Sequence, residues 1–285
     1  MKYALNILLL ISVLFCNKLY AEDGTYKDWG KALQEKSKVK VLKMSFRNID
    51  TIPDILDQFP NLEEIDFNNN SIKTLPPSLF RCARIKKIIL FRNKIKVLPE
   101  AIGRLKTLEE LSMGYNEIKT LPDSIGYLPA LTIINFSRNE IDSLPASVSN
   151  LKNLKTLRIP NNNIRVLPPG IGMLTQLEFL DIGNNYIERL PEDIGNFTEL
   201  QFLYVNRNRI SHIPESIANC KKLQELDVVQ SGIIRLTNAL SDLRKLEYVY
   251  IDNRTTPFYA NPRNAARQKI VQVSSDNVFY RMSHN

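Results

Sequence analysis

A pattern of 23 residues recurs along this chain and constrains its fold more than any other feature. The frame L-x-x-L-x-L-x-x-N-x-I-x-x-L-P-x-x-I-x-x-L-x-x begins at Leu62, Ile85, Leu108, Leu131, Leu154, Leu177, Leu200 and Leu223. Weaker copies begin at Val39 and Leu246, so ten units follow one another over residues 39–254 with no insertion. A fixed period of this length predicts a solenoid, in which each unit packs against its neighbours.

Each unit contains the pattern of one short strand. Its fourth and sixth residues, such as Leu180 and Ile182, are apolar and alternate with outward-facing positions, as in a strand with one buried face. The Leu-Pro pair stops a helix, so we expect the chain to return in an irregular or 3₁₀ conformation. The expected fold class is α/β: a curved, right-handed solenoid with a parallel sheet on its concave face.

The ninth residue of the unit is asparagine in seven consecutive units. An amide both donates and accepts hydrogen bonds, so it can satisfy backbone groups where the chain leaves the strand. We therefore expect a ladder of stacked asparagines along the core. Its members are Asn70, Asn93, Asn116, Asn139, Asn162, Asn185 and Asn208.

The repeat resembles that of leucine-rich repeat proteins, and the resemblance covers residues 39–254. The segment GTYKDWGKALQ, followed by Leu-Pro repeats, is similar to the exported leucine-rich repeat proteins of spirochaetes, the leptospiral type. This resemblance implies a bacterial envelope or secreted protein that meets host or envelope partners.

Residues 1–21 have the layout of a signal peptide. Lys2 precedes an apolar run over residues 4–16, and a short polar stretch ends at Ala21. The run of about 13 residues is shorter than the roughly 20 that a membrane span requires, so no transmembrane span is expected in the mature chain. We favour cleavage after Ala21, although lipidation of Cys16 is the alternative, with the bulky Phe15 before it. The expected location is secreted, periplasmic or at the bacterial surface, attached to the outer membrane if Cys16 is lipidated.

The segments that flank the repeats are expected to cover the two ends of the solenoid. Residues 22–38 carry Tyr26, Trp29 and Leu33 at near-helical spacing, which predicts a short helical N-terminal cap. Residues 255–285 are expected to form a C-terminal cap. In that cap, Asn261-Pro262 can begin a helix and KIVQV (269–273) is expected to be a strand.

Cys82 and Cys220 both occupy the twenty-first position of a unit, where other units carry Leu or Phe, so we expect them in the core. They lie six units apart, which corresponds to about 29 Å at roughly 4.8 Å per strand. A disulfide requires Cα atoms within about 7 Å, so no disulfide is expected.

The sequence contains no recognisable catalytic arrangement. His212 and His284 are the only histidines, and neither belongs to a Ser-His-Asp or Cys-His pattern. Some bacterial leucine-rich repeat effectors carry a ubiquitin-ligase domain, but only 31 residues follow Arg254 here, without a cysteine. The charge of +8 comes with interspersed acidic residues, unlike a nucleic-acid-binding block. We expect no enzymatic activity, cofactor, metal or nucleic-acid partner.

A ligand is expected on the outward-facing third, fifth and seventh residues of each strand unit, with the eighth at the rim. Phe179 and Phe202 occupy the same row in adjacent units, with Tyr204 beside them, and exposed aromatic residues mixed with Arg are typical of protein interfaces. Two alternatives remain: scattered exposed apolar residues are common, and the C-terminal flank can fold over the last two tyrosines. The candidate residues are Ile89, Phe91, Tyr115, Ile133, Arg138, Arg158, Phe179, Asp181, Phe202, Tyr204, Arg207, Tyr248 and Tyr250.

Two functions follow from these expectations. The first is an exported, non-enzymatic module that binds a protein of unknown identity through the concave face. The second is a structural envelope lipoprotein, anchored through Cys16, that self-associates or supports assembly.

Overall fold

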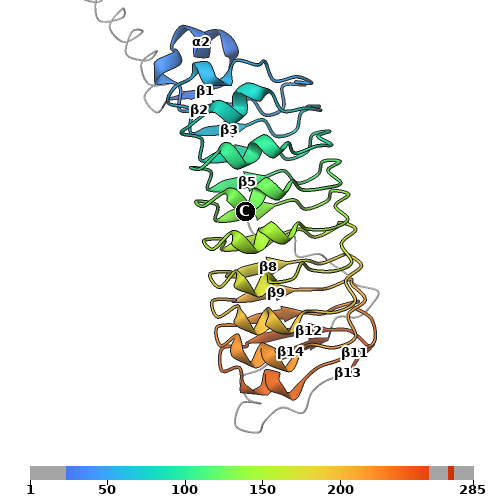
Figure 1. Ribbon diagram of the computed structural model, residues 1–285. Helices are drawn as coiled ribbons and strands as arrows, with labels where there is room; N and C mark the ends of the chain where they lie inside the picture. Colours follow the sequence, from blue (N-terminus) through green and yellow to red (C-terminus); the bar gives the residue numbers. More distant parts are fainter. Residues whose placement is uncertain (1–23, 257–268, 273–285) are drawn as a thin grey trace, which may run out of the picture.

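The computed structural model describes residues 24–256 and 269–272, and these residues form a stack of similar units. Each turn of the chain adds one strand to a sheet and one short helix to the opposite side (Figure 1). The expected fold class is confirmed: the molecule is a solenoid with a parallel sheet and a 3₁₀-helical outer side.

Twelve strands form the main sheet, and all their pairings are parallel. Paired residues of neighbouring units are separated by the repeat length, as Ile65 and Ile88 illustrate. The strands of the main sheet are β1 (Thr25–Tyr26), β2 (Val41–Lys43), β3 (Glu64–Asp66), β4 (Lys87–Ile89), β5 (Glu110–Ser112), β6 (Ile133–Asn135), β7 (Thr156–Arg158), β8 (Phe179–Asp181), β9 (Phe202–Tyr204), β10 (Glu225–Asp227), β12 (Tyr248–Ile251) and β14 (Lys269–Gln272).

The other side of the solenoid consists of 3₁₀ helices. In most units the proline of Leu-Pro lies just before the helix in an extended conformation, as Pro122 does with φ −71° and ψ 151°. Proline fixes φ and removes an N–H donor, so the short helix begins after it. The helices are η1 (Lys36–Lys38), η2 (Leu56–Gln58), η3 (Pro77–Arg81), η4 (Glu100–Arg104), η5 (Asp123–Tyr127), η6 (Ala146–Asn150), η7 (Ile171–Met173), η8 (Glu192–Asn196), η9 (Glu215–Asn219) and η10 (Asn238–Asp242).

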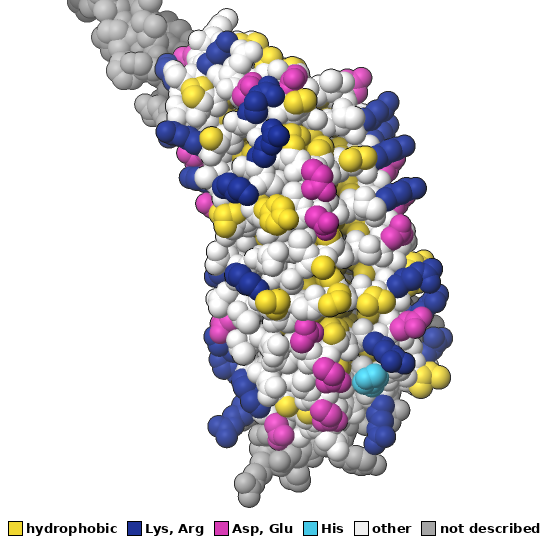
Figure 2. All heavy atoms as spheres, in the orientation of Figure 1, with side chains coloured by type: hydrophobic (Ala, Val, Ile, Leu, Met, Phe, Trp, Pro, Cys, Tyr) yellow, Lys and Arg dark blue, Asp and Glu magenta, His cyan; other side chains and the backbone are white. Residues whose placement is uncertain are grey.

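One continuous apolar core runs the length of the stack between the sheet and the 3₁₀ helices. Cys82 and Cys220 belong to this core as free thiols, and burial raises the pKa of each to about 12. Figure 2 shows the 3₁₀ side, where charged side chains of both signs surround scattered apolar ones. Within the described residues, no helix is long and apolar enough to cross a membrane.

The ninth unit departs from the repeat. Its eleventh residue, Ile233, is 83% exposed, whereas Ile234 is fully buried and takes the inward place. Ser231 replaces the asparagine, and Gly232 adopts a φ of +110°, so the chain leaves the strand along a different path. Ile234 then begins β11 (Ile234–Arg235), which pairs with β13 (Thr255–Thr256) in a small second sheet.

The N-terminal cap contains the expected short helix, α2 (Trp29–Gln34). Two details differ from the expectation. Tyr26 lies in β1 and pairs with the first unit, because a sheet edge offers it backbone partners. Leu33 is 37% exposed, and the small Ala32 is the buried contact instead.

At the C-terminal end, β14 lies within the expected KIVQV strand and pairs with β12. The predicted signal peptide, the processing site at Cys16, the helix start at Asn261-Pro262 and His284 lie outside the described residues.

Candidate functional site

The ladder asparagines hold neighbouring units at a constant spacing. The Asn116 amide nitrogen donates to the carbonyl oxygens of Leu90 at 2.9 Å and Met113 at 3.0 Å. Its Oδ1 accepts from the Ile95 N–H at 3.0 Å. The same three contacts recur at Asn93, and the series from Asn93 to Asn208 is buried. The outward-facing rows of the sheet therefore stand on a backbone that is hydrogen-bonded from unit to unit.

The rim of the concave face has an unusual backbone conformation that the repeat letters do not reveal. The eighth residue has a positive φ of 52–59° in nine consecutive units, which is the left-handed region. Asparagine tolerates this region well, whereas bulky side chains do so at a cost. Three units carry asparagine there, but Arg92, Tyr115 and Arg138 also adopt it.

Phe179, Phe202 and Tyr204 form a contiguous cluster on β8 and β9, which we call the aromatic patch. The ring centroids of Phe179 lie 5.8 Å from Phe202 and 5.3 Å from Tyr204, the latter edge-on at 86°. The Arg158 guanidinium lies over the Phe179 ring at 5.5 Å. All three aromatic side chains are half-buried, so their packing fixes the rings while part of each remains open to solvent.

Acidic residues of β10 lie beside the aromatic patch. The Tyr204 hydroxyl donates to Glu225 at 2.9 Å, and burial together with this bond raises the pKa of Tyr204. Burial raises the pKa of the Asp227 carboxyl to about 7, and the nearby Asp181 and Glu225 raise it as well. The patch is thus apolar at its centre and carries carboxyl groups on one side.

Asp181 differs from the expectation of an exposed contact residue. It is 9% exposed, and burial raises the pKa of its carboxyl. Its Oδ1 accepts from the Gly183 N–H at 3.1 Å, and its Oδ2 lies 3.9 Å from the Arg158 Nε. Asp181 therefore lies close to Arg158 below the surface of the patch and is not itself presented to a partner.

A second cluster lies nearer the N-terminus, on the loops that follow β4, β5 and β6. Tyr115 is in edge contact with Phe91 at 4.6 Å. The guanidinium groups of Arg92 and Arg138 lie over the Tyr115 ring at 5.1 Å and 4.8 Å. We call Arg92, Tyr115 and Arg138 the arginine–tyrosine cluster.

The remaining candidates do not join one site. Ile89 and Ile133 are half-buried on β4 and β6, and Arg207 is half-buried at the rim beyond β9. Tyr248 and Tyr250 stack on each other at 6.2 Å on β12, where β14 pairs beside them in the sheet. The candidate residues thus divide between the aromatic patch, the arginine–tyrosine cluster and other positions along the sheet.

Sequence reasoning omitted three residues from the candidate list. Glu225 and Asp227 occupy the third and fifth positions directly after the aromatic units, so extending those two rows by one unit finds them. Arg92 stands at the eighth position of the unit before Tyr115, and a comparison of eighth positions alone finds it.

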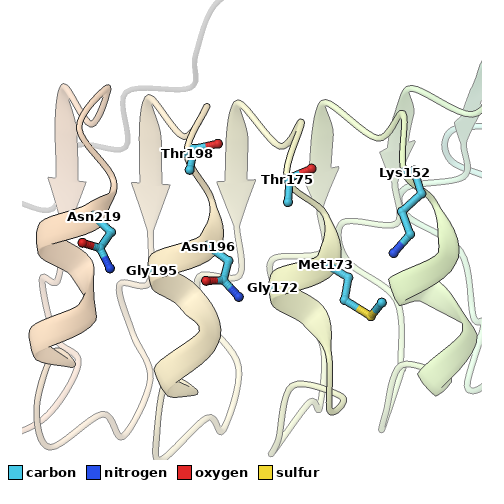
Figure 3. Close-up of a pocket in the computed structure, with 8 residues that line it drawn as sticks. All are labelled: Lys152, Gly172, Met173, Thr175, Gly195, Asn196, Thr198 and Asn219. Atoms are coloured by element: carbon cyan, nitrogen blue, oxygen red, sulfur yellow. The ribbon is translucent and has the colours of Figure 1, made fainter.

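An open groove of about 710 Å³ crosses the 3₁₀ side over η7, η8 and η9 (Figure 3). It lies on the opposite side of the solenoid from the outward-facing rows of the sheet, and its lining contains no His, Cys, Asp or Glu. Within the part of the chain that the structure describes, no group of three such residues is placed to hold a metal ion. The lining residues are Lys152, Gly172, Met173, Thr175, Gly195, Asn196, Thr198 and Asn219.

Parallel 23-residue units, an asparagine ladder and a 3₁₀ outer side define a leucine-rich repeat solenoid. The chain belongs to the leucine-rich repeat family. The family model described as "Leucine-rich repeat region" matches residues 111–184 and 150–256, together more than half of the chain. The model described as "Leucine Rich Repeat" matches residues 61–82. The expected resemblance is confirmed.

Solved structures show the same fold. A leucine-rich repeat protein of Leptospira interrogans is 23% identical with a TM-score of 0.63, over 88% of this chain and 77% of that one. An internalin of Listeria monocytogenes is 20% identical with a TM-score of 0.67, over 86% and 76% of the two chains.

The ectodomain of the Arabidopsis thaliana receptor kinase GASSHO1/SCHENGEN3 was solved in complex with CASPARIAN STRIP INTEGRITY FACTOR 2. It is 23% identical to this chain with a TM-score of 0.73, over 84% of this chain and 31% of that one. At these identities the likeness concerns the fold alone. No curated protein sequence matches the chain.

Proposed function

We propose that this chain is an exported, non-enzymatic module that binds a protein partner through its concave face, centred on the aromatic patch. The observation that carries the proposal is the mutual packing of Phe179, Phe202 and Tyr204, with centroids 5.3–6.5 Å apart, on a face that the fold does not require to be aromatic. Packed aromatic residues beside an arginine are the usual anchors of protein interfaces, because they bury a large area and lose little conformational entropy.

Two further observations support this proposal. The three rings pack on one another and the Arg158 side chain lies over Phe179, so the patch is ordered before a partner arrives, which lowers the entropic cost of binding. A similar fold, the GASSHO1/SCHENGEN3 ectodomain, was solved in complex with a second protein factor.

The test is a capture experiment with the immobilised mature chain against envelope and host-surface extracts. We expect one or a few proteins to be retained by the wild-type chain and lost with Phe179→Ala/Phe202→Ala. Removal of one aromatic anchor from an interface typically costs about 2 kcal/mol or more of binding free energy. The loss of two is therefore expected to abolish capture.

The matched control is Tyr127→Ala/Met173→Ala, which removes two exposed apolar side chains from the 3₁₀ side, 58% and 51% exposed. This control is expected to retain the same proteins, and all variants are expected to keep the far-UV circular dichroism of the wild type. Equal capture by Phe179→Ala/Phe202→Ala and the wild type would contradict the proposal.

The export part of the proposal rests on residues 1–21. Intact-mass measurement of the mature protein distinguishes its two forms: cleavage after Ala21, or a chain that begins at a lipidated Cys16. The second result would favour the structural envelope lipoprotein over the secreted binding module.

A further inference from the structure

The arginine–tyrosine cluster is built from three consecutive units and is separate from the aromatic patch. Tyr115 is at its centre, and the units on either side supply Arg92 and Arg138, whose guanidinium carbons lie 5.1 Å and 4.8 Å from the ring centroid. Arg92 also lies 5.7 Å from the Phe91 ring. Each arginine therefore lies over the face of an aromatic ring, whose electron-rich surface attracts the positive guanidinium.

The backbone is shaped to allow this cluster. Gly114 stands just before Tyr115, and a Cβ there would lie 3.0 Å from two carbons of the Phe91 ring. Glycine thus lets that ring lie against the next unit, where it meets Tyr115 edge-on.

The cluster also carries a backbone cost. Arg92, Tyr115 and Arg138 have φ values of 55°, 56° and 54°. A left-handed conformation is unfavourable for an ordinary L-residue, and less so for asparagine, which Asn161 and Asn184 supply at the same position. Residues whose backbone conformation is unfavourable for their type are expected at functional sites.

The two guanidinium groups have no acidic partner within the described residues. No carboxylate oxygen lies within 4.0 Å of Arg92 or Arg138, and both side chains are exposed. The acidic residues at the tenth position of the Tyr115 and Arg138 units pair elsewhere: Glu117 with Lys96 and Glu140 with Lys119, each at 3.6 Å. Both positive charges are therefore available to a ligand.

Stacking also leaves the right hydrogen-bonding groups free. A guanidinium that packs its face on a ring keeps its in-plane N–H donors, which match the two oxygens of a carboxylate. The two arginines come from alternate units, so their backbones lie about 10 Å apart, twice the strand spacing. Their guanidinium carbons are no more than about 10 Å apart, since both lie near the Tyr115 ring. In a polyproline II segment, residues three apart project from the same side at roughly 9.3 Å.

We propose that the arginine–tyrosine cluster binds an acidic, extended segment of a protein, in which two carboxylate side chains three residues apart each meet one arginine. This inference extends the proposed function, since it names the chemistry of part of the partner. It concerns other residues than the aromatic patch and is tested separately.

The test measures fluorescence anisotropy with three labelled peptides of equal length: four Glu-Pro-Pro repeats, four Gln-Pro-Pro repeats and four Lys-Pro-Pro repeats. At about 50 mM salt, where screening is weak, the full chain is expected to bind the Glu peptide and neither of the others. Arg92→Gln/Arg138→Gln is expected to weaken this binding about tenfold, since two exposed ion pairs that water and salt partly screen are lost.

Two variants serve as controls. Lys73→Gln/Lys94→Gln removes the same charge from exposed lysines outside the cluster, and its affinity is expected to stay within about twofold of the wild type. Arg92→Lys/Arg138→Lys keeps the charge and loses the planar donors, so binding is expected to fall severalfold. Thermal melts check that every variant is folded.

Three results would overturn the inference. They are unchanged binding of the Glu peptide by Arg92→Gln/Arg138→Gln, an equal loss with the lysine control, and wild-type affinity with the Arg-to-Lys variant. A single-stranded oligonucleotide that binds more tightly than the Glu peptide, with the same dependence on Arg92 and Arg138, would also overturn it. Phe179→Ala/Phe202→Ala is expected to bind the Glu peptide normally, so failure here and failure of the aromatic patch are distinguishable.

Discussion

Asp181 and Asp227 occupy the same row of the concave face, and Tyr204 stands between them on the intervening strand. Burial raises the pKa of both carboxyl groups, and the charge of Asp181 raises the pKa of Asp227 further. Arg207 partly offsets this at Asp227, and Arg158 does so at Asp181. Tyr204 of the aromatic patch therefore lies between two carboxyl groups that are costly to ionise.

The first prediction concerns the pH dependence of stability. An unfolded aspartate releases its proton near pH 4, and Asp227 in the folded chain does so at about 7. The folded chain holds more protons between these values, so its stability falls as pH rises through that window. Asp227→Asn is expected to match the wild type at pH 4 and to be more stable above pH 7, by at most about 4 kcal/mol.

Thermal melts of both proteins from pH 4 to pH 8 check this prediction. The control is Asp142→Asn, an exposed aspartate on the far side of the asparagine ladder, which is expected to show no such growing difference. A pH-independent gap between Asp227→Asn and the wild type would contradict the assignment.

The second prediction concerns the asparagine ladder. Asn116→Ala leaves the Ile95 N–H and the carbonyls of Leu90 and Met113 without their amide partner inside the core. The expected loss is about 3 kcal/mol in the free energy of unfolding by urea, because buried polar groups without partners are costly. The exposed Asn150→Ala is expected to stay within about 0.5 kcal/mol of the wild type.

A serine variant refines this second prediction. Ser231 stands at the ladder position of the ninth unit, and its hydroxyl donates to the Val205 carbonyl at 2.7 Å. Asn116→Ser can keep one donor in the same way, so its stability is expected between those of the wild type and Asn116→Ala. Equal stability of all three proteins would show that the ladder amides contribute little.

The third prediction concerns the packing of neighbouring 3₁₀ helices. A Cβ on Gly126 would lie 2.2 Å from the Ser147 carbonyl oxygen and 2.6 Å from its Cβ, so Gly126→Ala forces η5 and η6 apart. We expect a loss of about 2 kcal/mol, typical of overpacking. At Gly30 the nearest atom is 3.4 Å away, and Gly30→Ala in α2 is expected to be neutral or slightly stabilising. Denaturation midpoints that are equal for these two variants would refute the steric argument.

The fourth prediction concerns the left-handed eighth position. Gln230 has a φ of 56°, and its backbone N–H donates to Asp252 at 2.7 Å, a contact that any residue except proline can make. Asparagine accepts this conformation more readily than glutamine, so Gln230→Asn is expected to stabilise the chain by about 0.5 kcal/mol. Urea denaturation provides the measurement, and a destabilised Gln230→Asn would contradict this explanation of the rim.

The repeat made the main features of the fold predictable, because the same pattern of apolar residues, asparagine and proline recurs in many units. The positions of the strands, the 3₁₀ side and the buried face of each unit follow from residue spacing alone. Features that occur once were missed. The burial of Ile234 in place of Ile233 depends on the path that Gly232 allows. The strand at Tyr26 depends on the free backbone edge that the first unit offers at Leu42.

The candidate site was predictable only in part. Spacing shows that Phe179 and Phe202 share a row, since that is a property of the backbone. It does not show that Asp181 is buried, because burial depends on the bulk of side chains in adjacent rows. Nor does it reveal that Arg92 and Arg138 converge on Tyr115, because this depends on the rotamers of three long side chains.

Because the repeat has no insertions, the distance between the arginine–tyrosine cluster and the aromatic patch follows from the number of units between them. Tyr115 and Phe179 belong to units that begin at Leu108 and Leu177, three steps apart, or about 14 Å along the sheet. A duplicate of residues 154–176, inserted after residue 176, would recreate the same junctions and lengthen this distance by about 4.8 Å. The distance between the two surfaces can therefore change only in steps of one strand spacing, and a ligand that spans both is selected by its length as well as by its chemistry.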